Sequence, residues 1–210
     1  MTTIAILGPE HSQSWQAAAQ FAPAAAIRAY PHVRDLLAAF DAHLADYAIL
    51  PVYNTREGEK KQSFRLFDQI RTGFWIDNIL LQGNLSLGVF DEGITIGDLQ
   101  LLIGQREVFI QCEEFIEERM PGITEMSVQD VARAVADIRA SGDTANRAVI
   151  DNADTLNALG LRVIERELAP HNRTRYAVLG HALAEATGYD ATTLITEPLD
   201  DRVGLLVDIL

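Results

Sequence analysis

Three consecutive polar side chains near the carboxyl end of the chain have the chemistry needed to bind a small acid. Thr174, Arg175 and Tyr176 supply a hydroxyl, a guanidinium and a phenol after a Pro-His-Asn turn. If Tyr176–Leu179 is a strand, alternation sends Thr174 and Tyr176 to one face and Arg175 to the other. A guanidinium takes a carboxylate through two N–H groups, and a nearby hydroxyl adds a donor. The segment indicates a carboxylate site, although a surface Arg beside a strand Thr gives the same pattern.

Polar side chains also follow two predicted strands in the first third of the chain. Thr3–Leu7 and Tyr47–Val52 have the continuous apolar composition of buried strands. The first strand precedes an Ala-rich helix over Ser12–Phe21. The first backbone N–H groups of this helix could bind an anion. Ordinary N-capping explains the serines at its start equally well. Open α/β sheets bind ligands beyond the carboxyl ends of their strands. The candidate ligand-binding residues at these two ends are Ser12, Ser14, Asn54 and Thr55.

The overall composition restricts the partners of the chain. A net charge of −13 argues against nucleic acid and anionic membranes, because both require a basic surface. The single Cys112 excludes an intrachain disulfide, and no apolar run reaches the roughly 20 residues of a membrane helix. The first residues lack the features of an export signal, so we expect a soluble cytoplasmic protein. The 5 histidines have no metal-ligand spacing, so we expect no metal.

Alternating strand and helix patterns predict an α/β protein with two lobes. We expect residues 1–73 and 166–182 to form a discontinuous first lobe, and residues 74–165 to form the second. Phe74–Phe90 has long apolar runs without a helical period, which favours extended chain that crosses between the lobes. Within the second lobe, Val108–Arg119 has the pattern of one helix.

Several of these segments resemble the prephenate dehydratase family. The run from Asn172 to Tyr176 is similar to the Asn-x-Thr-Arg-aromatic motif that closes the family's catalytic domain, where the aromatic residue is usually Phe. Ile4–Glu10, Tyr47–Gly58 and Ile110–Cys112 fall in the family's order and at its spacing. The resemblance covers nearly the whole chain and implies a periplasmic-binding type II-like fold, with a discontinuous first lobe and a ligand cleft between the lobes.

The resemblance also implies a reaction and a set of residues. Prephenate would lose its ring carboxylate as carbon dioxide and its ring hydroxyl as water, giving phenylpyruvate without a cofactor. A Thr hydroxyl is too weak an acid to titrate, so Thr174 would act as a positioned donor and Arg175 as a carboxylate clamp. The implied catalytic residues are Thr174 and Arg175, and the implied substrate-binding residues are Asn54, Thr55, Ser12, Ser14, Gln105, Arg106, Asn172 and Tyr176.

Three of the four cleft motifs depart from the family pattern. The first loop has Ser12 and Gln13 where the family has Thr and Phe, and Tyr53 replaces a Glu. Gly104–Glu107 stands where the family has Ser-His-Pro-Gln, which adds the guanidinium of Arg106. Two alternatives therefore stay open beside a working dehydratase. One is a decarboxylase that retains the ring hydroxyl, and the other is a non-catalytic binder of a small carboxylate.

The last residues resemble the beginning of an ACT domain, the unit that binds phenylalanine in regulated dehydratases. Residues 189–210 match its first strand, loop and helix start. We expect this partial unit to lack phenylalanine feedback, because the remaining strands would build the pocket. Alternatively, strands over Ala191–Glu197 from two chains pair in a shared sheet, which would support the homodimer or higher homo-oligomer that we expect.

Overall fold

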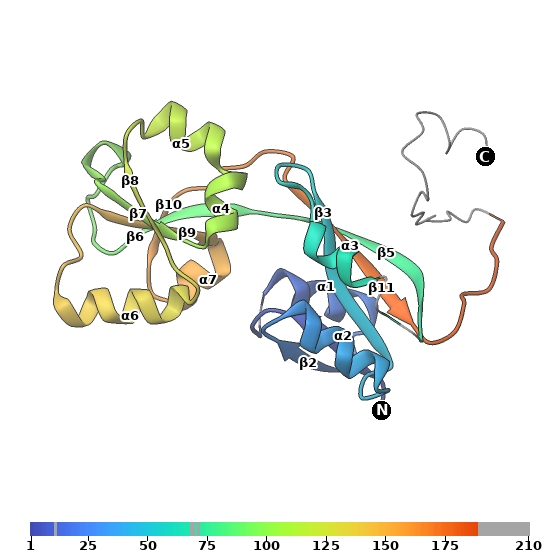
Figure 1. Cartoon of the computed structure of the whole chain (residues 1–210). Coiled ribbons are helices and arrows are strands. Elements are labelled where there is room, and N and C mark those ends of the chain that lie inside the picture. The colour runs from blue at the N-terminus through green and yellow to red at the C-terminus, as the bar shows by residue number, and fades with distance from the viewer. Residues whose placement is uncertain (11, 68–69, 71, 189–210) are drawn as a thin grey trace.

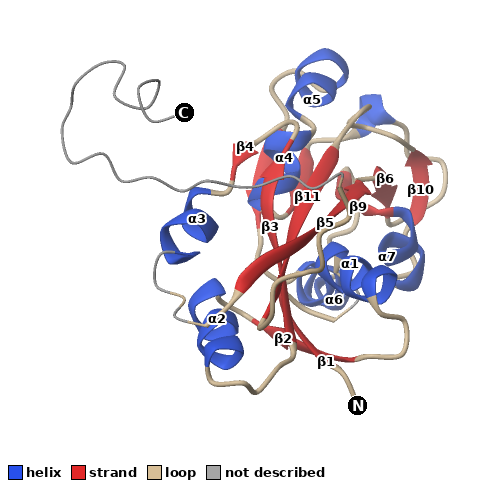
Figure 2. Cartoon of the chain, turned by 90° about the vertical axis from the view of Figure 1, so that its right-hand side faces the viewer, coloured by secondary structure: helices blue, strands red, loops and turns tan. Residues whose placement is uncertain are grey.

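The chain folds into two lobes, each built on one sheet (Figure 1). This computed structural model describes residues 1–10, 12–67, 70 and 72–188, so the ACT-like tail expected over 189–210 lies outside the described residues. Helices cover the sheets of both lobes (Figure 2). The expected two-lobed α/β fold is confirmed.

The first sheet has the strand order β2-β1-β3-β11-β5, with the short β4 paired to β3. Strands β1, β2 and β3 run parallel, whereas β11 lies antiparallel to both β3 and β5. Helix α1 packs on one face of this sheet through Ala17 and Ala18, and α2 packs on the other through Leu36 and Phe40. The elements are β1 (Thr3–Leu7), α1 (Gln13–Phe21), β2 (Ala26–Tyr30), α2 (Val33–Asp41), β3 (Tyr47–Asn54), β4 (Gly58–Glu59), α3 (Lys61–Phe67), β5 (Phe74–Gln82) and β11 (Arg173–Gly180).

The second sheet has the order β10-β6-β9-β7-β8. Strand β7 runs parallel to β8 and β9, and β6 lies antiparallel to β9 and β10. The elements are β6 (Leu85–Val89), η1 (Ile96–Asp98), β7 (Leu101–Gly104), α4 (Arg106–Gln111), α5 (Glu113–Arg119), β8 (Thr124–Ser127), α6 (Val131–Ser141), β9 (Arg147–Asn152), α7 (Ala153–Ala158) and β10 (Arg162–Glu165).

The first lobe holds more of the chain than the sequence predicted. Strand β5 pairs with β11 from Phe74 to Gln82, so residues 74–82 belong to the first sheet and not to the second lobe. The chain crosses between the sheets after Gln82 and returns after Glu165. The boundary moves because the apolar residues of β5, such as Ile79, complete the core of the first sheet.

The helix predicted over Val108–Arg119 is two short helices. Cys112 ends α4 and begins α5 with φ −102° and ψ 9°, outside regular helical geometry. Its side chain is fully buried and packs with Phe109 and Ile116, as expected for a core residue. The break turns the end of α4 toward the first lobe, where Gln111 contacts Glu57.

The central strands of both sheets are buried on their two faces, which explains their continuous apolar sequences. In β3, residues Ala48, Ile49 and Leu50 are all inaccessible to solvent, because helices cover both sides of the sheet. Within the described ranges, every helix is too short or too polar to cross a bilayer.

The close contact between Gly73 and Phe40 gives a test of this packing. A Cβ on Gly73 would lie 2.6 Å from Phe40 Cε1, and the Phe40 ring is fully buried and stacked 4.1 Å from the His181 ring. Gly73→Ala should therefore lower the free energy of unfolding by about 1–3 kcal/mol, measured by urea denaturation. Gly97→Ala is the control, because only Thr95 Oγ1 lies near its Cβ, at 3.9 Å. Equal stability of the two variants would contradict the packing.

Candidate active site

A bulge in β3 places Asn54 on the same face of the sheet as Thr174. Thr174 pairs with Asn54, Arg175 with Tyr53, and Tyr176 with Pro51. Val52 is therefore an extra residue in β3, and a single extra residue turns the following side chains to the opposite face. Without it, alternation would send the Asn54 carboxamide away from the Thr174 hydroxyl.

The carboxamide of Asn54 holds this end of the sheet together. Asn54 is fully buried, and its Nδ2 donates to Thr174 Oγ1 at 2.9 Å and to Asn172 Oδ1 at 2.8 Å. Its Oδ1 accepts the backbone N–H groups of Arg56 and Glu57 at 2.8 and 3.1 Å. Since the amide is the donor to Thr174, that bond leaves the hydroxyl hydrogen of Thr174 free for another acceptor. The Thr174 hydroxyl is therefore held in place by Asn54 and is able to act as a donor.

A chain of hydrogen bonds continues from Asn172 into the second lobe. Asn172 Nδ2 donates to Gln111 Oε1 at 2.7 Å, and Gln111 Nε2 donates to Glu57 Oε1 at 2.6 Å. Lys60 Nζ then pairs with Glu57 Oε2 at 2.5 Å. Because Gln111 ends α4, this chain joins the lobes directly beside Thr174.

A second contact between the lobes involves Arg56. Its guanidinium donates to Glu114 Oε2 and to the Pro170 carbonyl, both at 2.9 Å. Sequence analysis assigned no role to Arg56, Glu57 or Gln111. Gln111 stands inside the Ile110–Cys112 segment, so only that resemblance pointed to it.

Tyr176 is a buried phenol beside the Thr174 hydroxyl. Burial raises the pKa of Tyr176 well above its ordinary value, while hydrogen bonds to Ser14 and Thr174 act in the opposite direction. The phenol therefore stays neutral at physiological pH and serves as a hydrogen-bond donor. Its hydroxyl lies 3.4 Å from Gln13 Oε1, and both Gln13 and the buried Ser14 belong to the first turn of α1. The structure thus brings Ser14 and Tyr176 to Thr174.

Two predicted binding residues have structural partners. Ser12 is the N-cap of α1, where its Oγ accepts the Trp15 N–H at 3.4 Å. Thr55 Oγ1 donates to the His171 carbonyl and accepts the Arg173 N–H, both at 2.9 Å. The Ser12 hydroxyl thus caps α1, the Thr55 hydroxyl fixes the loop beside Asn54, and their role in substrate binding stays a prediction.

The remaining predicted residues lie outside the Thr174 cluster. Alternation in β11 places Arg175 on the opposite face, where it is exposed beside Tyr53 and Leu80. Its assignment as a carboxylate clamp stays a prediction that this placement does not support. Gln105 caps α4 and donates to the Gln129 carbonyl at 3.3 Å, and Arg106 is exposed in the first turn.

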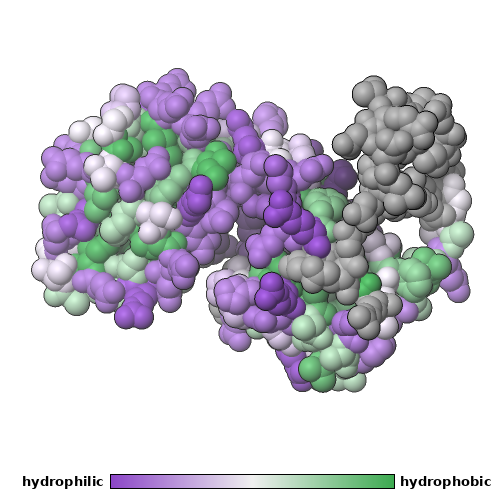
Figure 3. All heavy atoms as spheres, viewed as in Figure 1, coloured by the Kyte–Doolittle hydropathy of each residue, from purple (hydrophilic) through white to green (hydrophobic). Residues whose placement is uncertain are grey.

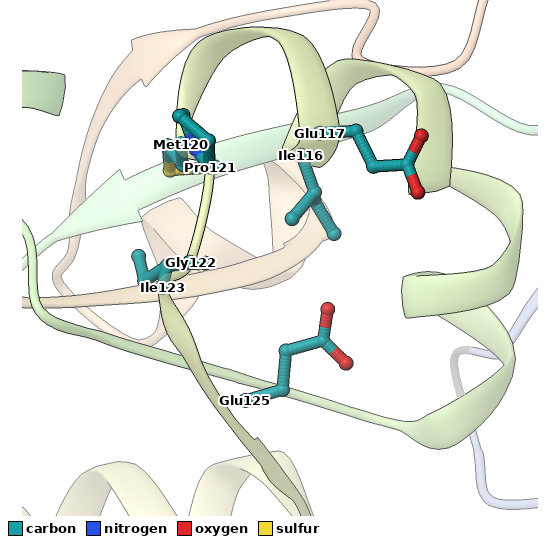
Figure 4. Close-up of a pocket in the computed structure, with 7 residues that line it drawn as sticks. All are labelled: Ile116, Glu117, Met120, Pro121, Gly122, Ile123 and Glu125. Atoms are coloured by element: carbon teal, nitrogen blue, oxygen red, sulfur yellow. The ribbon is translucent and has the colours of Figure 1, made fainter.

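The surface is hollowed between the two lobes (Figure 3). A separate pocket lies in the second lobe where α5 leads into β8, with Ile116 and Met120 beside the carboxylates of Glu117 and Glu125 (Figure 4). Its acidic rim would repel a dianion, so this pocket does not suit the expected substrate. Among the residues that the structure describes, no group of His, Cys, Asp and Glu is placed to hold a metal ion.

The fold and the position of these side chains define a class of ligand-binding protein. The two lobes carry polar side chains at the carboxyl ends of strands, the arrangement of two-lobed proteins that close on small molecules. A sequence model described as Prephenate dehydratase matches residues 4–183. The chain therefore belongs to the prephenate dehydratase family, as the motifs predicted.

Solved structures share this fold. A prephenate dehydratase from Arthrobacter aurescens, in complex with L-Phe, is 22% identical with a TM-score of 0.73, over 89% of this chain and 63% of that chain. The enzyme from Staphylococcus aureus is 19% identical with a TM-score of 0.68, over 99% of this chain and 78% of that one. At these identities the likeness establishes the fold alone.

Curated relatives are longer than this chain. A bifunctional chorismate mutase/prephenate dehydratase from Neisseria gonorrhoeae is 28% identical over 99% of this chain and 57% of its own length. One from Aquifex aeolicus is 22% identical over 91% of this chain and 52% of its own length. The chain thus spans about half the length of the curated relatives that it matches.

Removal of the Asn54 carboxamide should destabilise the protein. Asn54→Ala leaves buried polar groups of Thr174 and Asn172 without their partner, which should cost about 2–4 kcal/mol of unfolding free energy. The measurement is urea denaturation followed by circular dichroism. Asn78→Ala, an exposed change in β5, is the control and should shift stability by less than about 0.5 kcal/mol. A similar small shift for Asn54→Ala would show that the network does not stabilise the fold.

Proposed function

We propose that the chain is a prephenate dehydratase that converts prephenate into phenylpyruvate in aromatic amino acid biosynthesis. One observation carries the proposal, together with the family membership. Thr174 is 5% exposed, and its hydroxyl accepts a hydrogen bond from Asn54 and can in turn donate to a substrate oxygen. This is the group that the reaction needs beside the departing ring hydroxyl.

The geometry favours hydroxyl loss through hydrogen bonding to the leaving oxygen. As the ring carboxylate departs as carbon dioxide, the electrons of its bond enter the ring, and the hydroxyl takes up a proton from solvent and departs as water. Thr174 stabilises the developing charge as a positioned donor, and the neutral phenol of Tyr176 lies in hydrogen-bond contact with Thr174. We propose Ser14, Asn172 and the guanidinium of Arg106 as further substrate contacts.

The second candidate is a decarboxylase that does not expel the hydroxyl. It stays open because Ser12, Tyr53 and Gly104 differ from the residues of the family motifs. The retained pair of Thr174 and Asn54 favours the dehydratase, since a donor to the ring hydroxyl has no task in a reaction that keeps it. A non-catalytic binder would leave prephenate intact.

We further propose a cytoplasmic homodimer or higher homo-oligomer, in keeping with the biosynthetic relatives.

Removal of the Thr174 hydroxyl tests the proposal. Thr174→Ala should lower kcat at least about a hundredfold, with a smaller change in KM, because the donor acts mainly as the hydroxyl departs. Thr174→Ser keeps a hydroxyl and should retain most of the activity. The assay follows phenylpyruvate by its absorbance in base and identifies the product by mass.

Thr124→Ala, an exposed change on β8, is the matched control and should behave as the unmodified chain. Unchanged turnover in Thr174→Ala would show that Thr174 takes no part in expelling the ring hydroxyl. A dihydro keto acid as product would identify the decarboxylase instead.

A further inference from the structure

Four hydrogen bonds beside Thr174 form a closed ring that begins and ends at Glu57. The backbone N–H of Glu57 donates to Asn54 Oδ1 at 3.1 Å, and Asn54 Nδ2 donates to Asn172 Oδ1 at 2.8 Å. Asn172 Nδ2 donates to Gln111 Oε1 at 2.7 Å, and Gln111 Nε2 donates to Glu57 Oε1 at 2.6 Å. We call these four residues the amide ring, and all its bonds run in the same direction.

The amide ring joins the two lobes at the candidate active site. Gln111 comes from the end of α4 in the second lobe, whereas Asn54 ends β3 and Asn172 immediately precedes β11 (Figure 2). Asn54 and Asn172 are almost completely buried, so water does not replace a bond that either of them loses. Each amide of the ring therefore depends on its neighbours for its hydrogen bonds.

Glu57 sets the direction of these bonds. The oxygen and nitrogen ends of a side-chain amide have nearly the same shape, so the partners decide which end faces which neighbour. A backbone N–H can only donate, and a carboxylate can only accept. Glu57 supplies both groups, one at each end of the series of three amides. The amides then have a single arrangement in which every donor meets an acceptor.

The carboxylate of Glu57 is enclosed beside the site. Its side chain is 11% exposed, and Oε2 takes Lys60 Nζ at 2.5 Å, so each of its oxygens has a donor. Burial raises the pKa of Tyr176, and the charge of Glu57 acts in the same direction. The carboxylate thus lies close enough to the phenol to affect it, and the phenol is in contact with Thr174.

The direction of the ring decides what Thr174 can do. Asn54 presents its nitrogen to Thr174 Oγ1 at 2.9 Å, so the hydroxyl accepts from Asn54 and can donate elsewhere. If Asn54 were turned over, its oxygen would take the Thr174 hydrogen, and the hydroxyl would have nothing to donate to a substrate. Hydrogen bonds that run in one direction also polarise one another, which strengthens the correct arrangement.

We propose that Glu57 is a positioning residue for the dehydration, an inference that rests on the proposed function. Its carboxylate fixes the direction of the amide ring, and the ring keeps the Thr174 hydroxyl able to donate to the departing ring hydroxyl. Glu57 acts through Gln111, Asn172 and Asn54, without contact with the reacting atoms.

The first test changes the Glu57 carboxylate into an amide. Glu57→Gln keeps the shape of the side chain but offers one acceptor to two donors, Gln111 Nε2 and Lys60 Nζ. When Lys60 takes that oxygen, a donor faces a donor within the ring, so kcat should fall at least about tenfold with a smaller change in KM. Glu59→Gln, the same change at an exposed position in β4, is the matched control and should keep kcat.

Two further variants separate the direction of the ring from the charge of Glu57. In the double variant Glu57→Gln/Lys60→Met, the new amide oxygen is left to Gln111, so kcat should return to within about threefold of the unmodified chain. Glu57→Asp keeps the charge but is one CH₂ shorter than the distance to Gln111 requires, so it should lose activity as Glu57→Gln does. Full activity in Glu57→Asp, or no recovery in the double variant, would overturn the inference.

A readout that does not depend on turnover is the set of side-chain NH₂ signals in ¹⁵N NMR spectra. Glu57→Gln should shift the signals of Gln111, Asn172 and Asn54, because a disturbed link changes each bond that follows it. Glu59→Gln should shift none of them. A shift confined to Gln111 would show that Glu57 has only a local effect, against the inference.

The outcomes distinguish this inference from the proposed function. If the unmodified chain forms phenylpyruvate and Glu57→Gln matches the Glu59→Gln control, the role of Glu57 fails while the proposed function stands. If the unmodified chain forms no phenylpyruvate, the proposed function fails and the role of Glu57 in dehydration fails with it.

Discussion

The buried carboxamide of Asn54 is the constraint on which the site depends. A primary amide removed from water costs several kcal/mol unless its donors and acceptor are all paired. Here its two donor bonds go to Thr174 and Asn172, and its oxygen takes two backbone N–H groups. These partners come from segments 120 residues apart, so satisfying one side chain fixes the end of β3 against the start of β11. The orientation of the Thr174 hydroxyl follows from that requirement.

The same network connects the position of the lobes to the state of the site. Gln111 links Asn172 to Glu57, and Arg56 reaches Glu114, so the break at Cys112 sets how α4 meets the first lobe. Any hinge motion that parts the lobes would strain or break these bonds and change the hydrogen bonding of Asn172. Separation of the lobes and the ordering of Asn54 and Thr174 would therefore be coupled through these polar contacts.

The sequence predicted the α/β class and the two lobes, and it named Thr174 and Asn54 as candidates, because apolar strands and polar strand ends are local patterns. The sequence did not predict the features that depend on which strands pair with one another. The bulge at Val52 and the membership of β5 in the first sheet are set by which strands become neighbours. Gln111 gains its importance only from its distant partners Asn172 and Glu57, which local residue types do not report. For Arg175, the predicted alternation holds, yet it separates the guanidinium from Thr174.

The position of β11 has a consequence for biosynthesis of the protein. This strand comes after the whole second lobe in sequence, yet it lies between β3 and β5 near the centre of the first sheet. On the ribosome, β5 therefore has no partner until residues 173–180 leave the exit tunnel. The second lobe, contained within residues 85–165, has all its strands available earlier. The nascent chain should thus fold its middle before its beginning, and the half-made first sheet is the stage at which a chaperone would be needed.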